Sequence, residues 1–215
     1  MIQAIVEGRK TQTRRVIKPQ PRRIDDAFDG TWEWKEKGHY YDDLTLYEEL
    51  RSKPPYQVGE TVYIKEAWAE WINTSEHLAS GVISIEEARA DVIYKATTPN
   101  WDEILKENGN PYLIKHTLLM PEWAARYFIK IKAVRAERLQ EITNEGIIAE
   151  GIARTQHKCN PGFADAILWY YHDGGTYCGD PGVPVFRRPW DSINKDYPWE
   201  SNPWVWVYTF VKLEA

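Results

Sequence analysis

Cysteine is scarce in this chain: among 215 residues there are two, Cys159 and Cys178. Long hydrophobic runs are missing. No apolar core of a signal peptide opens the sequence, and no stretch of about 18 apolar residues offers a transmembrane helix. The sequence therefore carries no signal of its own for secretion or membrane insertion. We expect a cytoplasmic protein with reduced thiols and no membrane partner, while protein partners are left open.

A general excess of positive charge is also absent, because the formal net charge is −5. This excludes a protein that binds polyanions over its whole surface. The basic residues are nevertheless unevenly spread. Residues 1–23 carry +6, from seven lysines and arginines against Glu7 alone, which leaves −11 for the remainder of the chain. Such a basic segment can gather phosphate groups locally.

Aromatic residues are abundant, with 11 Trp and 13 Tyr. So many large rings predict a dense core and some surface on which flat ligands can stack. The length fits one domain that carries long insertions. We therefore predict a single domain over residues 1–215, with insertions at about 25–57, 69–119 and 155–190.

The order of predicted elements indicates a mixed α+β fold. Composition and alternation predict strands at Thr61–Trp68, Val92–Ala96 and Tyr127–Val134. The closing run Pro203–Val211 is apolar on both faces, which is typical of an interior strand in a curled sheet. Residues 97–119 are predicted to be irregular. The predicted helices cover Ile2–Glu7, Asp42–Leu50, Ile85–Ala90, Thr143–Glu150, Phe163–Tyr171 and Pro189–Asn194. Scattered strands with inserted helices favour a small β-barrel over a βαβ arrangement.

The basic run between Gly8 and Arg15 carries the clearest chemistry. Lys10, crowded by cations and partly desolvated, would have a lowered pKa and could act as a general base. A threonine beside it, such as Thr13, could be the nucleophile that this base activates. The guanidinium groups of Arg14 and Arg15 could hold a phosphate or a carbonyl oxygen of a substrate. The alternative is a solvated arm that binds phosphates loosely.

The pattern Gly8-x-Lys10-x-x-Thr13-x-Arg15 resembles the signature of ASCH-domain proteins, G-x-K-x-x-(E or T)-x-R. Other blocks resemble the longer, phage-associated members of that family. They span nearly the whole chain, at Val58–Trp68, Met120–Ala124, Glu137–Ile142, Ala149–Ile152 and Asn202–Val207. The resemblance implies a PUA-like β-barrel with helical insertions, from a superfamily that binds RNA or modified bases. Longer members have a strand before the segment that matches residues 1–6, so we expect either an internal start or a barrel without that edge strand.

Thr13 stands where many ASCH members have glutamate, and members with threonine there are similar to bacterial N4-acetylcytidine amidohydrolases. That resemblance implies a site of lysine, threonine and glutamate, which match Lys10, Thr13 and Glu150. Glu150 has an argument of its own, because a carboxylate at the C-terminal end of a helix opposes the helix dipole. The alternative for Glu150 is an exposed surface residue. The further substrate-binding candidates, beside the two arginines, are Lys65, Glu66 and Trp123, whose ring could stack on a pyrimidine.

A second constellation is formed by His157, Cys159, His172 and Cys178. Four such side chains within 22 residues could close a tetrahedral zinc site. Their spacing matches no recognised zinc pattern, however, and we favour two free cysteines and two surface histidines in a loop.

Three functions remain open at this point. The first is an amidohydrolase that removes an acyl group from an N4-acylated cytidine or related base, without metal or organic cofactor. The second is a non-catalytic module of phage origin that binds RNA or a modified base. The third is a ribonuclease. The sequence leaves open whether the base is free, in a nucleoside or in RNA. A nucleoside amidohydrolase should depend little on salt, whereas an RNA-binding module should lose affinity steeply as salt rises.

Overall fold

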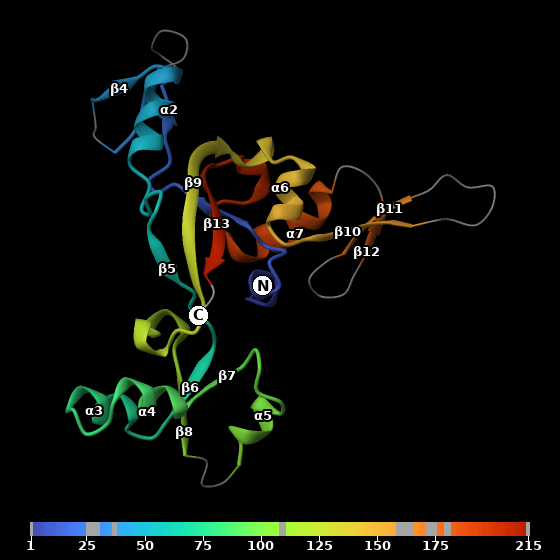
Figure 1. Cartoon of the computed structure of the whole chain (residues 1–215). Helices are drawn as coiled ribbons and strands as arrows, with labels where there is room; N and C mark the ends of the chain where they lie inside the picture. Colours follow the sequence, from blue (N-terminus) through green and yellow to red (C-terminus); the bar gives the residue numbers. More distant parts are fainter. Residues whose placement is uncertain are drawn as a thin grey trace. The chain divides into compact units, whose positions relative to one another are not determined.

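The computed structural model describes residues 2–24, 31–35, 38–107, 111–157, 166–170, 176–178 and 182–213. These residues form a mixed α+β structure (Figure 1). Its helices are α1 (Ile2–Val6), α2 (Asp43–Ser52), α3 (Thr74–Ala79), α4 (Ile85–Ala90), α5 (Trp101–Ile104), α6 (Asn144–Ala149) and α7 (Val183–Ile193). Short 3-10 helices are η1 (Thr117–Leu119), η2 (Glu122–Ala124), η3 (Leu139–Glu141) and η4 (Trp199–Ser201). The shorter strands are β2 (Arg22–Arg23), β3 (Trp32–Glu33), β4 (Tyr40–Tyr41), β5 (Thr61–Tyr63), β6 (Trp68–Trp71), β7 (Val92–Tyr94), β8 (Tyr112–Lys115) and β12 (Thr176–Cys178). The longer ones are β1 (Gln12–Val16), β9 (Phe128–Arg138), β10 (Ala153–His157), β11 (Ala166–Tyr170) and β13 (Trp204–Leu213).

The chain divides into two compact units. Gln3–Glu60 and Lys130–Val211 belong to the first unit, and Thr61–Ile129 form the body of the second. The second unit thus contains the region 69–119 that the sequence predicts as an insertion. Each unit has its own buried apolar cluster.

The central sheet has the strand order β1-β13-β9-β5 (Figure 1). β1 is antiparallel to β13, and Thr13 lies opposite Tyr208 in this pairing. Because β13 has a neighbour on each side, the prediction of an interior strand from the two-sided apolar run is confirmed. The long strand predicted from Tyr127 is confirmed as β9, although it continues to Arg138.

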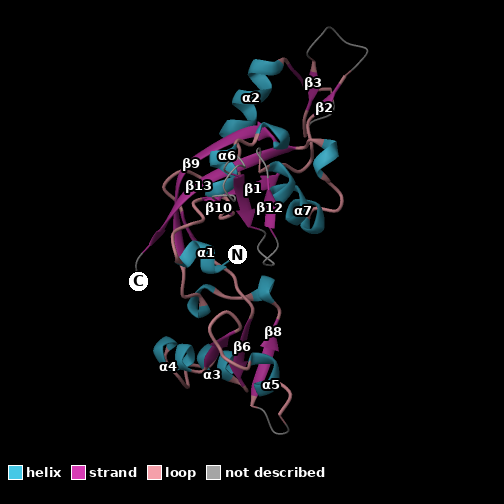
Figure 2. Ribbon diagram, turned by 90° about the vertical axis from the view of Figure 1, so that its right-hand side faces the viewer, coloured by secondary structure: helices cyan, strands magenta, loops and turns pink. Residues whose placement is uncertain are grey.

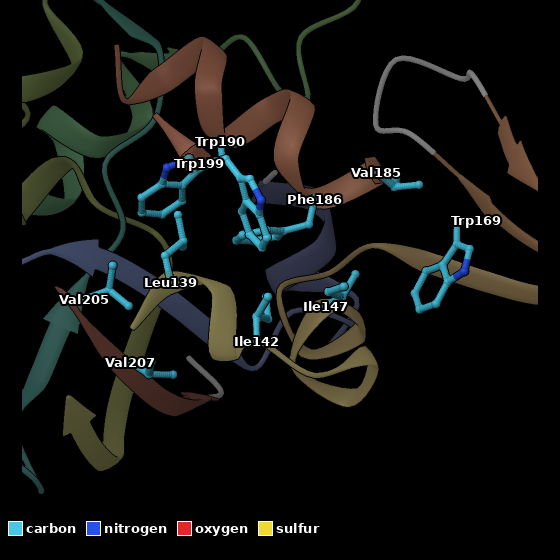
Figure 3. Close-up of a cluster of buried hydrophobic side chains, with 10 residues drawn as sticks. All are labelled: Leu139, Ile142, Ile147, Trp169, Val185, Phe186, Trp190, Trp199, Val205 and Val207. Atoms are coloured by element: carbon cyan, nitrogen blue, oxygen red, sulfur yellow. The ribbon is translucent and has the colours of Figure 1, made fainter. Parts of the chain in front are cut away.

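The core of the first unit lies between the sheet and two helices. It is built from η3, α6, β11, α7, η4 and β13, through Leu139, Ile142, Ile147, Trp169, Val185, Phe186, Trp190, Trp199, Val205 and Val207 (Figure 3). α6 begins as predicted, because the Thr143 hydroxyl accepts a hydrogen bond from the Gly146 amide at 3.2 Å. α2 begins on a capping box in which Asp42 and Thr45 each accept from the other's backbone amide.

One prediction near the C-terminus is wrong, and another places a helix correctly but starts it too late. The predicted helix at Phe163–Tyr171 is replaced, over its described part, by β11, which pairs with β10 on one side and β12 on the other. The backbone hydrogen bonds of two partners outweigh the weak helical pattern of this short apolar run. The predicted turn Pro189–Asn194 is the second half of the longer helix α7. Pro184 lies in its first turn, where a missing amide costs no helical hydrogen bond, so the helix starts earlier than predicted.

The second unit contains the three-stranded antiparallel sheet β7-β6-β8, which α3, α4 and α5 flank (Figure 2). The predicted strand Thr61–Trp68 is divided here into β5 and β6. The segment 97–119, predicted to be irregular, contains α5 and β8. β8 forms a strand because its backbone pairs with β6. Trp68, Val92, Met120, Ala124 and Ala125 form the core of this unit. Helix α4 at Ile85–Ala90 is confirmed.

Within the described ranges, none of the helices has the length and apolar character needed to cross a bilayer. The mixed α+β class is confirmed, with antiparallel pairing in the central sheet and in three further small sheets.

Candidate functional site

A cavity of about 420 Å³ opens in the first unit. Lys10, Thr13, Arg14, Arg15 and Glu150 all line it. An apolar wall is contributed mainly by α7, through Val185, Phe186, Pro189, Trp190 and Ile193. The cavity therefore combines charged groups with an apolar surface, which is the usual composition of a small-molecule site.

Lys10 and Glu150 are brought together by backbone pairing, although 140 residues separate them. They form an antiparallel β-bridge, and the next amide, that of Thr11, donates to the Ala149 carbonyl at 2.8 Å. Glu150 is the C-terminal cap of α6, as the sequence predicts. The Lys10 ammonium donates to the Glu150 carboxylate Oε2 and also to the Glu150 carbonyl oxygen, at 3.0 Å.

The pair belongs to a chain of alternating charges. Arg14 donates from Nη1 to Glu150 Oε1 at 3.2 Å, and from Nη2 and Nε to Glu137 Oε1 at 2.8 and 3.0 Å. Glu137 in turn accepts at Oε2 from Arg135 Nε at 2.9 Å. The Arg14 side chain is 1% exposed and that of Glu150 is 9% exposed, whereas Arg135 is 41% exposed. This series of ion pairs therefore runs from the solvent-exposed Arg135 to the buried Lys10. Each buried charge in it has a partner of opposite sign.

Burial lowers the pKa of Lys10 from its usual value, and this effect outweighs the opposing attraction of Glu150. The positive charges of Arg15 and Arg14 lower the pKa further. The expectation of a desolvated lysine crowded by cations thus agrees with the geometry. A lysine in this position loses its proton more readily than one in water, which suits a general base.

Two glycines allow the close approach of these groups. Gly146 lies in α6, and a Cβ there would meet Arg14 Nη2 at 2.9 Å. Gly151 follows Glu150 with φ +92°, and a Cβ there would meet the Lys10 Cβ at 3.0 Å and the Ala4 Cβ at 3.1 Å. The absence of side chains at these positions lets the helix end lie directly against Lys10 and Arg14.

We predict that Gly151→Ala destabilises the protein by about 1–3 kcal/mol, because alanine is strained at positive φ. The matched control is Gly59→Ala, which has the same φ of +92° but no neighbour within 4 Å of an added Cβ. Urea denaturation of both variants separates backbone strain from crowding of Lys10. Equal losses would show that contact with Lys10 and Ala4 adds nothing.

The structure places the remaining predicted residues in two groups. Thr13 and Arg15 line the same cavity as Lys10. Lys65, Glu66 and Trp123 belong to the second unit. Their part in substrate binding stays a prediction.

The three second-unit residues have contacts of their own. Glu66 is buried and accepts from Arg126 Nε and Nη2, both at 2.7 Å. The Lys65 ammonium donates to the Leu118 carbonyl at 2.6 Å. Trp123 packs edge-on against Trp68, with ring centroids 6.2 Å apart. These contacts contribute to holding the second unit together.

The zinc candidates are only partly described. Cys159 and His172 lie outside the described residues, and of His157 only the backbone, in β10, is described. Cys178 is a free, exposed thiol at the end of β12. In the ranges that the structure describes, no group of three His, Cys, Asp or Glu side chains is placed to hold a metal ion.

Sequence reasoning missed Glu137 and the apolar wall. Glu137 lies in a strand among charged neighbours, Arg135 and Arg138, where alternation predicts solvent exposure. The apolar wall was missed because the two prolines in the sequence of α7 argue against a continuous helix there. Comparison of the chain with protein-family models, with curated proteins and with solved structures found no match.

Proposed function

We propose that this protein is an amidohydrolase that removes the acyl group from the exocyclic amine of an N4-acylated cytidine. We also propose that its first unit is a PUA-like barrel of the ASCH type, which the antiparallel sheet with interior strand β13 supports. One observation carries the functional proposal. Lys10, Thr13 and Glu150, selected by resemblance although Glu150 follows Lys10 by 140 residues, line one cavity.

The Lys10–Glu150 contact suits the required proton states. A general base at Lys10 must be neutral, and a general acid at Glu150 must be protonated. Moving one proton along their hydrogen bond converts the ion pair into this neutral pair without any exchange with solvent. The low pKa of Lys10 reduces the free-energy cost of that transfer.

The reaction then follows in two halves. Lys10 takes the proton of the Thr13 hydroxyl while Thr13 Oγ1 forms a bond to the acyl carbon. Glu150 gives its proton to the amine nitrogen as the C–N bond breaks, which releases cytidine and leaves an acyl ester on Thr13. Water then attacks this ester and gives a proton to the ionised Glu150. Lys10 returns its proton to Thr13 Oγ1 as the ester bond breaks, so the carboxylic acid product leaves and the neutral pair is restored. A guanidinium or backbone amide at the cavity stabilises the oxyanion in each half.

A route in which Lys10 activates water directly, with Thr13 only positioning it, uses the same residues. The apolar wall from α7 supports either route, because it limits access of bulk water and strengthens the electrostatic interactions nearby. A non-catalytic binding module is the second candidate. It is favoured by the basic lining, in which four cations, Arg9, Lys10, Arg14 and Arg15, line the cavity together with Glu150.

The test is hydrolysis of N4-acetylcytidine, followed by chromatography of released cytidine. The parent protein should release cytidine, and Thr13→Val should be slower by at least about 10². Thr13→Ser keeps the hydroxyl and should retain most of the activity. A mass increase of one acetyl group on acid-quenched protein would identify the ester route. No release by folded parent protein would refute the proposal and favour the binding module.

A further inference from the structure

We infer that the mouth of this cavity binds a phosphate group attached to the cytidine, and that Arg15 is the side chain that recognises it. The inference rests on the proposed function, because it names the substrate class of the same cavity. The preferred substrate is then a phosphorylated nucleoside or a nucleotide within a strand, and the same cavity accepts the free nucleoside with about tenfold lower affinity.

The cations deep in the cavity are already neutralised. Lys10 and Arg14 share Glu150, and Arg14 has Glu137 as a second carboxylate. Arg9, at the surface, pairs with Glu7 at 2.6 Å and donates to the Gly151 carbonyl at 3.2 Å. None of these three side chains needs a ligand to balance its charge.

Arg15 differs from the other three. Its side chain lines the cavity and is exposed, and Nη1 donates to the Arg14 carbonyl oxygen at 3.3 Å. Across the described part of the chain, no carboxylate lies within ion-pair distance of this guanidinium. The mouth therefore presents an uncompensated positive charge on a protein whose formal net charge is −5.

The position of Arg15 fits a group that extends from the reacting base. Arg15 and Thr13 are two residues apart in β1, opposite Trp206 and Tyr208, so both residues lie on the same face of the strand. Their spacing is about 7 Å along the strand. An acyl group at Thr13 and a phosphate at Arg15 leave room for the base and ribose between them.

Phosphate is the chemical class that this side chain binds best. A guanidinium presents two parallel N–H donors that match two phosphate oxygens, and charge-assisted bonds of this kind are stronger than bonds to a neutral group. A ribose hydroxyl would accept one such bond but would leave the charge unbalanced.

The inference can be tested without catalysis by measuring the binding of cytidine and of cytidine 5′-monophosphate. These are the products expected from an unphosphorylated and a phosphorylated substrate. By calorimetry, cytidine 5′-monophosphate should bind the parent protein about tenfold more tightly than cytidine. Arg15→Gln should reduce that ratio to about one while cytidine affinity stays within about twofold. Arg51→Gln, which removes an exposed charge in the last turn of α2 outside the cavity, is the control for net charge and should keep the parent ratio.

A parent ratio of one, an unchanged ratio in Arg15→Gln, or no binding of either product at millimolar concentration would overturn the inference. The proposed function is judged separately by cytidine release, so either idea can fail alone. A cytidine-containing trinucleotide separates the two sources of phosphate. If it binds at least tenfold more tightly than the monophosphate, the natural ligand is a strand, and equal or weaker binding assigns a mononucleotide.

Discussion

Replacement of Lys10 by arginine should reduce kcat/KM for N4-acetylcytidine by about 10²–10⁴, which is the usual contribution of a general base. Arginine keeps the positive charge and can still pair with Glu150, but its guanidinium does not lose a proton at accessible pH. Lys10→Met, which removes both the base and the charge, should lose activity to a similar extent. Cytidine release measures both variants, and circular dichroism shows that they are folded.

The pair of variants separates the role of the base from that of the charge. If Lys10 served only to hold Glu150 in place, Lys10→Arg would keep substantial activity and Lys10→Met would not. Equal losses in both variants support proton transfer by Lys10. Activity of Lys10→Met near the parent level would remove Lys10 from the mechanism altogether.

Lys10 also predicts a pH dependence. The active pair must keep the one proton that Lys10 and Glu150 share, so activity should fall as pH rises through the folded-state pKa of Lys10, which burial places below the usual 10.5. Between that lowered pKa and 10.5, the unfolded chain holds the proton and the folded protein does not. Stability should therefore increase with pH across this window, and the increase should be absent in Lys10→Met. Urea denaturation at several pH values, parent against variant, measures the difference.

The sequence predicts the ends of several helices because capping is local chemistry. Asp42 and Thr143 each accept a backbone hydrogen bond at the start of a helix, and Gly8 and Gly151 adopt positive φ where α1 and α6 end. The interior strand β13 was also predictable, because only a strand covered on both faces tolerates such an apolar run. These features depend on a few neighbouring residues.

The meeting of Lys10 with Glu150 was not predictable in this way. It depends on a bridge between residues 140 positions apart, and only the resemblance to a family suggested it. β11 was mistaken for a helix because its backbone is satisfied by partners far along the chain. Pairing across long sequence separations is decided by the whole fold, and local propensity does not report it.

Glu137 at the candidate site was likewise not predictable from its sequence neighbours. Glu137→Ala should destabilise the protein by about 3–5 kcal/mol, because removing one partner of a buried ion pair leaves an uncompensated charge. That charge is Arg14, whose guanidinium would keep the ion pair with Glu150 at 3.2 Å and a cation–π contact with the Phe186 ring, 5.9 Å to its centroid. Urea denaturation measures the loss, and an unchanged m-value shows that the same unfolding transition is compared.

The control is Arg135→Gln, which removes the solvent-exposed partner of the same carboxylate. Exposed ion pairs contribute about 0–1 kcal/mol, so this variant should remain near parent stability. A loss below about 1 kcal/mol in Glu137→Ala would show that other groups balance the charge of Arg14.

The double variant Arg14→Met, Glu137→Ala tests the same charge in a second way. Removal of both charges eliminates the uncompensated guanidinium, so the double variant should be more stable than Glu137→Ala alone. Since it also frees Glu150 Oε1 from Arg14, it should still be slow in cytidine release, which separates the stability of this charge chain from its part in positioning the proposed acid.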